Sequence, residues 1–410
     1  MGNYKCEQCG KEFTQKTQYT KHTNKKNPCI IECKQPEIIQ EVLDDTINKK
    51  KLGQFYTTNY SYILKNMHIP DGIVDIIEPF AGNGDLLNFL DKDKDKDKDK
   101  DKDKDKDKVK YNIMCYDIDP KQEYIIRQDT LLYPPNLENK YIITNPPYLA
   151  RNKSSDKSIF DKYNLNDLYK CFIQILINSN CKGGILIVPL NFISSIRNSD
   201  IRLRKNFIKK YNIEIINIFE ERVFDDTSYT ICSIQFNLRG VENINDKDHI
   251  INCFIYPKNK KIDFSLNNKN NYAIGGEIYN LPQNKTYKIE RATKSFDKNT
   301  YFTNILVKCI DDSIDNKIAL SIVNHDTKNK YIDNTQNLTA RSYAILVIEP
   351  QLTIEKEKKL VEKFNIFINN YRDKYNSLFL TNYRESNTIA RKRISFGLVY
   401  EICNYLLSQE

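Results

Sequence analysis

Short apolar segments alternate with polar or glycine-containing clusters in the first half of the chain. Four apolar segments each end in such a cluster, as buried strands do: 73–77, 111–116, 124–126 and 141–144. Leu86, Leu87, Phe89 and Leu90 follow the first cluster and continue it as a helix. In an open α/β sheet the carboxyl ends of the strands line one crevice. The pattern therefore predicts a doubly wound α/β sheet whose polar clusters converge.

The pattern changes after the strand-like segment 230–238. Polar stretches rich in Asn and Lys fill residues 240–300 and alternate with short strand-like runs such as 253–256. A further strand is predicted at 341–348 and a helix at 353–371, with apolar residues at positions 360, 361, 364, 367 and 368. We therefore predict a first large domain over residues 34–240 and a C-terminal α+β domain over residues 241–410.

Residues 91–108 are nine consecutive Asp-Lys pairs. Such a tract buries nothing, so we expect a solvated surface insertion within the first domain. It contributes no net charge, and the +9 of the whole chain suits an anionic partner. Basic and aromatic residues also interleave at 382–384 and 391–394, which fits phosphate contact, although a solvated charged face fits equally well.

Composition limits the location of the protein. The 410 residues suffice for two domains and a small appendage, and no apolar run is long enough to span a membrane. The polar N-terminus lacks the apolar stretch of a signal peptide, and the 11 cysteines favour thiols and a metal site over disulfides. We expect a soluble intracellular protein of the cytoplasm or nucleus. Abundant Lys, Asn, Ile and Tyr without Trp indicates an A+T-rich genome, and a viral gene is one source with that composition.

The segment Asn145-Pro146-Pro147-Tyr148 follows the last apolar strand of the first series. The Asn145 side-chain oxygen and the Pro146 carbonyl form an acceptor pair for both protons of a planar amino group, so the nitrogen lone pair can point at a methyl donor. The prolines fix the loop, and Tyr148 offers a flat face for stacking a base. An ordinary turn is the competing interpretation of these four residues.

The other polar clusters suit a nucleotide-like ligand. Gly82 and Gly84 lie in the turn after the first strand, where they allow the backbone to approach a ligand. Asp117 ends the second strand, at the position where such folds hydrogen-bond a ribose. Helix capping by Asp117 and a simple turn at Asp129 remain open as alternatives.

Together these motifs resemble a class I, S-adenosylmethionine-dependent DNA adenine-N6 methyltransferase of the gamma order, a Taq-like restriction-modification methylase, over residues 50–240. The resemblance implies a Rossmann-like methyltransferase sheet. It places Thr57 of the segment 52–58 near the methionine carboxylate, although Thr58 replaces the family's proline. The remaining cofactor contacts that it implies are Glu78, Phe80, Ala81, Gly82 and Gly84 on the amino-acid part, Asp117 on the ribose, Asp129 on the adenine amino group, and Ile118 and Asn145.

The same resemblance assigns the base and the recognition domain. Phe224, in the motif at 220–226, would sandwich a flipped adenine together with Tyr148, and Tyr229 is the alternative aromatic residue. Residues 241–410 would be the target recognition domain. The expected function is methyl transfer to N6 of a flipped adenine in double-stranded DNA, by a monomer with a possible separate restriction endonuclease.

Three other functions share parts of this pattern: RNA adenine-N6 methylation, protein glutamine-N5 methylation, and non-enzymatic DNA binding through a zinc finger. The glutamine enzymes lack a large C-terminal domain, and a non-enzymatic protein would have broken cofactor motifs. Cytosine-C5 methylation is excluded because its Pro-Cys pair, Pro28-Cys29, lies upstream of the cofactor motifs.

Residues 1–33 resemble a ββα zinc finger, with apolar residues Phe13 and Tyr19 at the core positions. A tetrahedral Zn²⁺ site is predicted from Cys6, Cys9, His22 and Cys29, with Cys33 as the alternative fourth ligand. If the helix docks as in ordinary fingers, Gln15, Gln18 and Lys21 face the major groove. A protein-binding finger is the competing interpretation.

Overall fold

The computed structural model divides the chain into two compact units, residues 1–53 and 54–410. It describes residues 4–6, 11–24, 52–90, 111–224, 227, 229–240, 249–282, 286–293, 296, 300–311, 317–333, 342–380, 384–386 and 389–409. The Asp-Lys tract at 91–108 and the predicted zinc ligands Cys9 and Cys29 lie outside these residues.

The first unit contains a two-stranded ribbon and one helix. Strands β1 (Tyr4–Lys5) and β2 (Glu12–Phe13) pair antiparallel, and α1 (Lys16–Thr23) follows them. The Tyr19 ring of α1 stacks on Tyr4 at a centroid distance of 5.9 Å and meets Phe13 edge-on at 6.2 Å. These aromatic contacts hold the helix against the ribbon, in the strand, strand, helix order that the sequence predicts.

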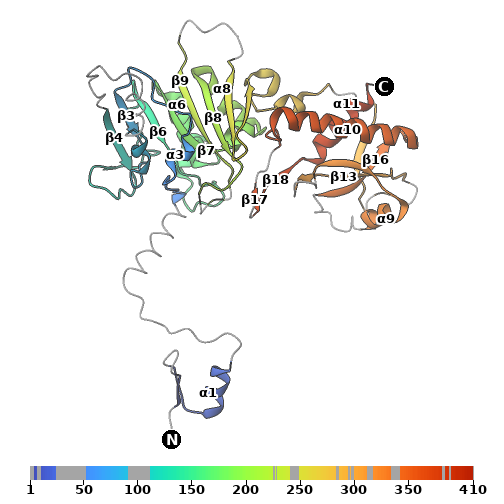
Figure 1. The fold of residues 1–410 in the computed structure, drawn as a ribbon, viewed down its shortest axis with the longest axis horizontal. Coiled ribbons are helices and arrows are strands. Elements are labelled where there is room, and N and C mark those ends of the chain that lie inside the picture. The colour runs from blue at the N-terminus through green and yellow to red at the C-terminus, as the bar shows by residue number, and fades with distance from the viewer. Residues whose placement is uncertain are drawn as a thin grey trace. The chain divides into compact units, whose positions relative to one another are not determined.

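A nine-stranded sheet dominates the second unit (Figure 1). Its strands in chain order are β3 (Asp75–Glu78), β4 (Asn112–Asp117), β5 (Ile126–Arg127), β6 (Tyr141–Thr144), β7 (Gly183–Pro189), β8 (Tyr211–Phe219), β9 (Ile231–Leu238), β10 (Ile251–Tyr256) and β11 (Lys260–Phe264). Their spatial order is β11-β10-β8-β9-β7-β6-β3-β4-β5. Strands β5, β4, β3, β6 and β7 run parallel, while β9 is antiparallel to both of its neighbours. The prediction of an α/β fold with a mostly parallel sheet is confirmed.

The helices around this sheet are short. They are α3 (Tyr60–Ile63), α5 (Ser158–Tyr163), α6 (Leu168–Asn178), α7 (Asn191–Ser194) and α8 (Asn198–Lys210), with 3-10 helices at Asp85–Leu87, Asn268–Asn270 and Gly276–Asn280. Helix α7 ends at Ser194, and α8 begins at Asn198 after a short break. The buried Arg204 guanidinium stabilises this break, because it donates to the carbonyls of Phe192 (2.7 Å) and Ser195 (2.8 Å).

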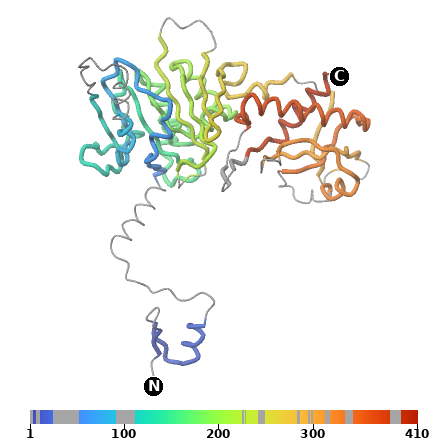
Figure 2. Tube along the Cα trace, in the orientation of Figure 1, coloured from blue at the N-terminus to red at the C-terminus, as the bar shows by residue number. Residues whose placement is uncertain are grey.

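The C-terminal part of the second unit combines two small sheets with helices. The four-stranded sheet is antiparallel, in the order β12 (Lys288–Arg291), β16 (Tyr343–Glu349), β13 (Ile305–Lys308) and β15 (Ala319–Ile322). The three-stranded sheet has the order β14 (Ile310–Asp311), β18 (Ile389–Arg393) and β17 (Arg384–Ser386). The helices are α9 (His325–Asp333), α10 (Ile354–Tyr375) and α11 (Phe396–Leu407). Figure 2 traces the helices α9, α10 and α11 in orange and red.

Helix α10 begins where the sequence predicts, because the Thr353 side chain caps it by accepting from the Lys356 amide at 3.3 Å. Its predicted apolar positions Leu360, Phe364 and Ile368 are buried. The boundary predicted at residue 240 falls within the large sheet, since β10 and β11 follow that residue and extend the sheet beyond β8. In the part of the chain that the structure describes, no helix has both the length and the apolar character of a membrane span.

Candidate active site

The Asn-Pro-Pro-Tyr loop leaves the carboxyl end of a fully buried strand. All four residues of β6 are buried, and Asn145 follows with only 8% of its surface exposed. β6 pairs with β3 on one side and β7 on the other, so it is an interior strand of the parallel part of the sheet. This position brings the loop beside the turn that follows β3, as the convergence of strand ends predicts.

Two hydrogen bonds fix the orientation of the Asn145 amide. Its Nδ2 donates to the Phe55 carbonyl at 2.7 Å and to Thr57 Oγ1 at 3.0 Å. The carboxamide oxygen Oδ1 therefore points the other way, where it accepts from the Tyr148 hydroxyl. Thr57, which the family resemblance would place near the methionine carboxylate, thus holds the Asn145 amide.

Tyr148 is anchored at both its ring and its hydroxyl. The hydroxyl is shared between Asn145 Oδ1 and the Ile187 carbonyl (2.8 Å), and the residue is 4% exposed. Burial raises the pKa of this hydroxyl well above its ordinary value, with smaller contributions from Cys232 and Asp167. Tyr148 therefore stays a neutral donor, which holds the Asn145 oxygen in place.

Phe55 contacts both aromatic residues that the family resemblance assigns to the adenine. Its ring stacks on Tyr148 at 5.1 Å and 26°, and it lies 6.1 Å from the Phe224 ring. Phe224 is 6% exposed and packs in the main core, whereas the alternative residue Tyr229 is half-buried. The ring of Phe55 thus contacts the rings of both Tyr148 and Phe224.

The turn after β3 needs its glycines. Gly82 and Gly84 have φ angles of +55° and +81°, in the left-handed region. A Cβ atom would lie 2.8 Å from the Tyr56 ring at Gly82 and 2.2 Å from the Tyr124 hydroxyl at Gly84. Within the same turn, Ala81 packs against Cys115 and Ile125. The ring of the adjacent Phe80 meets Phe172 edge-on at 4.9 Å.

Glu78 has a buried carboxyl oxygen that lacks a hydrogen-bond partner among the described residues. The residue is 1% exposed, and this oxygen is Oε2. Burial raises the pKa of Glu78 well above its ordinary value, and the nearby Asp117 and Asp85 carboxylates raise it further. A cationic ligand group beside Oε2 would relieve this penalty.

Asp117 fastens the glycine turn to β4. Its Oδ2 accepts from the Gly82 amide at 2.8 Å, while Oδ1 accepts from the Asp119 amide at 2.8 Å and from Gln54 Nε2 at 3.2 Å. Bends and turns, not an α-helix, follow Asp117 in this described stretch, so it does not serve as the helix cap considered above. Ile118 beside it is 41% exposed at the same edge of the sheet.

Asp129 organises a turn with one of its oxygens. Oδ1 accepts from the amides of Leu131 (2.9 Å) and Leu132 (3.0 Å), which matches the turn interpretation. The next residue, Thr130, donates from Oγ1 to the Pro79 carbonyl at 2.7 Å. This bond ties the Asp129 turn to the Glu78 turn, so both clusters belong to one site.

Asp167 was not singled out from the sequence, yet it lies against the Asn-Pro-Pro-Tyr loop. A β-bridge between Ala150 and Asp167 ties the end of this loop to the start of α6. The Asp167 carboxyl group is buried, its Oδ1 has no hydrogen-bond partner among the described residues, and burial raises its pKa to about 7. A polar residue directly before an apolar helix was the available signal, because that is the helix-capping position.

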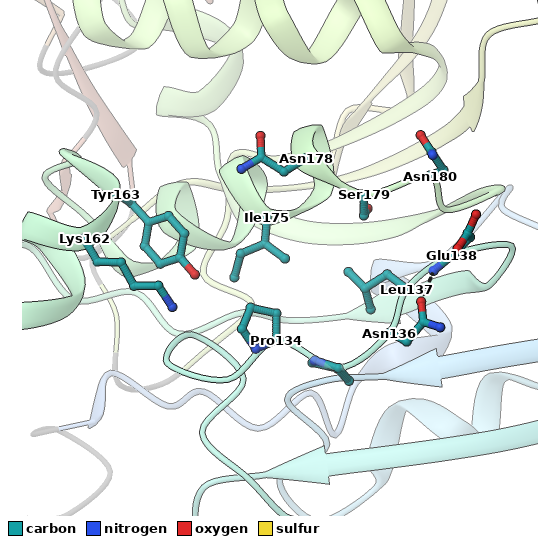
Figure 3. A pocket seen from close by; sticks show the side chains of 11 residues that line it. Pro134, Asn136, Leu137, Glu138, Lys162, Tyr163, Ile175, Asn178, Ser179 and Asn180 are labelled. Carbon is teal, nitrogen blue, oxygen red and sulfur yellow. Dashed lines mark hydrogen bonds between the residues drawn. The ribbon is translucent and has the colours of Figure 1, made fainter.

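A cavity of about 520 Å³ lies away from this chemistry (Figure 3). Lys162 and Tyr163 line one side of it, and the other lining residues lie in the loop before β6 and around the end of α6. These segments enter β6 and β7 at the edge of the sheet opposite Asn145. The cavity is therefore separate from the site built around the Asn-Pro-Pro-Tyr loop.

The described residues contain no cluster of three or more His, Cys, Asp or Glu side chains that could hold a metal ion. Of the predicted zinc ligands, Cys6 is buried at 2% exposure, and the His22 ring lies 4.9 Å from Phe13. Both belong to the ββα unit, while Cys9 and Cys29 lie outside the described residues, so the zinc site stays a prediction.

Comparison with curated proteins found no match. Among solved structures, the chain is similar to the type I restriction-modification methyltransferase subunit from Streptococcus thermophilus, with 14% identity and a TM-score of 0.35 over 54% of this chain and 53% of that one. It is also similar to the EcoKI M protein of a type I restriction enzyme, with 16% identity and a TM-score of 0.34 over 53% of this chain and 51% of that one. The chain thus spans about half the length of these subunits. Residues 57–224, which contain every predicted catalytic and cofactor-binding residue, match the Eco57I restriction-modification methylase family.

Proposed function

We propose that this protein transfers a methyl group from S-adenosylmethionine to the N6 amino nitrogen of an adenine flipped out of double-stranded DNA. The observation that carries the proposal is the fixed Asn145 amide, whose nitrogen is engaged by Phe55 and Thr57 so that its oxygen is presented as an acceptor. This acceptor stands at the end of β6, beside a glycine turn with a buried carboxylate.

The residues of the turn fit this cofactor. The unpartnered Glu78 Oε2 suits the ammonium group of a methionine moiety, and the backbone at Gly82 and Gly84 has no side chains to obstruct a ligand. Asp117 and Ile118 would contact the ribose side, and Asp129 Oδ2 the adenine amino group. When bound, the cofactor supplies a methyl group attached to a positively charged sulfonium.

The chain's own groups then act on the adenine. Asn145 Oδ1 and the Pro146 carbonyl accept hydrogen bonds from the two amino protons, which withdraws the nitrogen lone pair from the ring. Because Thr57, Phe55 and Tyr148 already hold the amide, these acceptors need not reorganise during the reaction. Tyr148 and Phe224 would pack on opposite faces of the base, which holds it against Asn145.

The remaining parts of the chain suit DNA binding. We propose that the elements after residue 264 form the target recognition domain, and that residues 1–33 bind Zn²⁺ through Cys6, Cys9, His22 and Cys29. The net charge of +9 favours association with phosphates. Separate specificity or restriction subunits are compatible partners, since the matched family is one of restriction-modification methylases.

Product analysis tests the chemistry. The purified chain and labelled S-adenosylmethionine are incubated with one candidate substrate at a time: duplex DNA, structured RNA or protein. The products are then digested and identified by mass spectrometry. We expect N6-methyladenine in DNA, and none with Asn145→Ala. N4-methylcytosine would preserve the amino-group chemistry but refute the adenine assignment, while label in RNA or in glutamine would refute DNA as the substrate.

Metal analysis tests the finger. We expect about one zinc per full-length chain, and loss of that zinc in Cys6→Ser but not in Cys403→Ser, because Cys403 is a buried free thiol of α11. Zinc retained by Cys6→Ser would place the metal at another site.

A further inference from the structure

The segment 54–57 crosses both parts of the candidate site. Gln54 donates to the Asp117 carboxylate at 3.2 Å, and the Tyr56 ring lies against Gly82. Phe55 stacks on Tyr148, and Thr57 accepts from the Asn145 amide. Four consecutive residues thus contact in turn the proposed ribose carboxylate, the base-stacking ring, the glycine turn and the catalytic amide.

Phe55 has the geometry of a stacked base. Its ring is nearly parallel to Tyr148 at 26°, the interplanar arrangement that a flipped adenine would adopt on the same face. The Phe224 ring is a second neighbour of Phe55, at a centroid distance of 6.1 Å. An adenine cannot stack on that face of Tyr148 while Phe55 is there, because two rings cannot occupy the same volume.

We propose that Phe55 occupies the place of the flipped adenine in the free protein and leaves it when the ligands bind, so that it controls entry of the base. This inference rests on the proposed function and adds to it a gating residue. The Phe55 carbonyl is itself held by Asn145 Nδ2, so the gate is attached to the catalytic amide that it covers.

The cofactor would help to open the gate. A ribose hydroxyl bound to Asp117 competes with Gln54 for Oδ1, and a ligand at the glycine turn displaces the Tyr56 ring from Gly82. Both neighbours of Phe55 thereby lose the contacts that hold them. The order of binding that follows is cofactor first and base second.

The absence of tryptophan from the chain permits a direct test. Phe55→Trp introduces a single tryptophan at the gate, whose emission is excited selectively at wavelengths that tyrosine does not absorb, and Phe367→Trp on α10 is a matched control. Phe367 is also half-buried between two rings, at 5.0 Å from Tyr371 and 6.1 Å from Tyr405, against 5.1 Å and 6.1 Å for Phe55. Acrylamide quenching is measured for both variants alone, with S-adenosylhomocysteine, and with duplex DNA added.

We expect quenching of the indole in Phe55→Trp to increase about twofold or more with S-adenosylhomocysteine and further with DNA, while quenching in Phe367→Trp stays constant. If the indole at the gate is equally protected in all states, the gate does not open and the proposal is overturned. Tryptophan is larger than phenylalanine and can itself disturb the packing at position 55. A second variant, Phe55→Ala, therefore tests the gate without adding a larger ring.

Phe55→Ala is examined with a duplex that carries 2-aminopurine at the methylated adenine, whose fluorescence rises when the base leaves the stack. Removing a gate that makes two ring contacts should favour base entry about tenfold, which lowers the DNA concentration needed for the signal. A weaker signal in Phe55→Ala would overturn the gate and make Phe55 a base-binding residue.

Methylation of DNA adenine by the wild-type protein is measured in parallel. Methylation without a quenching response of Phe55→Trp or an effect of Phe55→Ala refutes the gate and leaves the proposed function standing. A response of Phe55→Trp to S-adenosylhomocysteine without methylation of adenine keeps the gate and refutes adenine as the substrate. Failure of both readouts overturns both proposals.

Discussion

The two halves of the candidate site are prepared for their ligands in opposite ways. The cofactor half, formed by Glu78 to Gly84 with Asp117 and Asp129, contains a buried carboxylate oxygen that lacks a partner among the described residues. In the base half, formed by Asn145 to Tyr148 with Phe224, the amide and hydroxyl groups have partners and Phe55 covers the stacking face. A ligand adds contacts in the first half, whereas it must replace contacts in the second.

This difference indicates where binding free energy is available. Because Oε2 of Glu78 has no hydrogen-bond partner among the described residues, a cation gains an ion pair there without displacing one, and the raised pKa of Glu78 couples this gain to release of a proton. An adenine on Tyr148 gains stacking but displaces a phenyl ring of similar area, so the two terms largely cancel. The cofactor half should therefore dominate affinity, and the base half should dominate turnover.

Asn145→Ala should produce the largest effect and should confine it to turnover. Loss of one preorganised acceptor costs about 3 to 4 kcal/mol, or roughly a hundredfold to a thousandfold in kcat. Cofactor affinity should stay nearly unchanged by calorimetry, because Asn145 belongs to the base half. Asn178→Ala, on the exposed end of α6, is the matched control. Loss of cofactor binding in Asn145→Ala would show that the two halves do not act separately.

Asp167→Asn should alter stability with pH and leave the cofactor half intact. Burial raises the pKa of Asp167 to about 7, so between about pH 4 and pH 7 the unfolded chain ionises while the folded protein keeps the proton. The wild type therefore loses stability as pH rises through this window, and Asp167→Asn does not. We expect a relative difference of about 2 to 3 kcal/mol between pH 5 and pH 8.

Denaturant unfolding at the two pH values measures this difference. Asp161→Asn on α5 is the matched control, since the Asp161 side chain is 63% exposed. Parallel pH profiles for the wild type and Asp167→Asn would mean that the carboxyl group ionises normally in the folded protein despite its burial.

Glu78→Gln should weaken cofactor binding by about 1.5 to 3 kcal/mol, roughly tenfold to a hundredfold in Kd, through loss of a charge-assisted hydrogen bond. Because the pKa of Glu78 is raised in the free protein, binding to the carboxylate form should release a proton, and affinity should increase with pH. Calorimetry in buffers of different ionisation enthalpy detects this proton. Glu138→Gln, at an exposed position, should bind like the wild type. Equal Kd values for Glu78→Gln and the wild type would remove Glu78 from the cofactor site.

The sequence predicts which segments form the site more completely than it predicts the contacts between their side chains. The strand at 141–144 and the start of α10 at Thr353 follow from local patterns, namely an apolar run before Asn145 and a capping threonine before an apolar helix. Phe55, Tyr148 and Phe224 are far apart in the sequence, and hydrophobic periodicity does not predict which of these rings are in contact. The pairing of β8 with β10 is likewise non-local, so the change of composition at residue 240 did not reveal that the sheet continues.

Phe224→Ala should produce the smallest loss of kcat/KM, and the size of this loss tests whether Phe55 and the adenine exchange places. Stacking of a base on one aromatic ring contributes roughly 1 to 3 kcal/mol. Phe224 also contacts Phe55 in the free protein, so the variant loses a contact before base entry as well as after it. The net loss should therefore lie near the lower limit, about fivefold in kcat/KM. In the Phe55→Ala background, where the free protein has no such contact, Phe224→Ala should cost more, and Phe367→Ala should add nothing specific. Equal losses in both backgrounds would show that Phe55 and the adenine do not exchange places on Phe224.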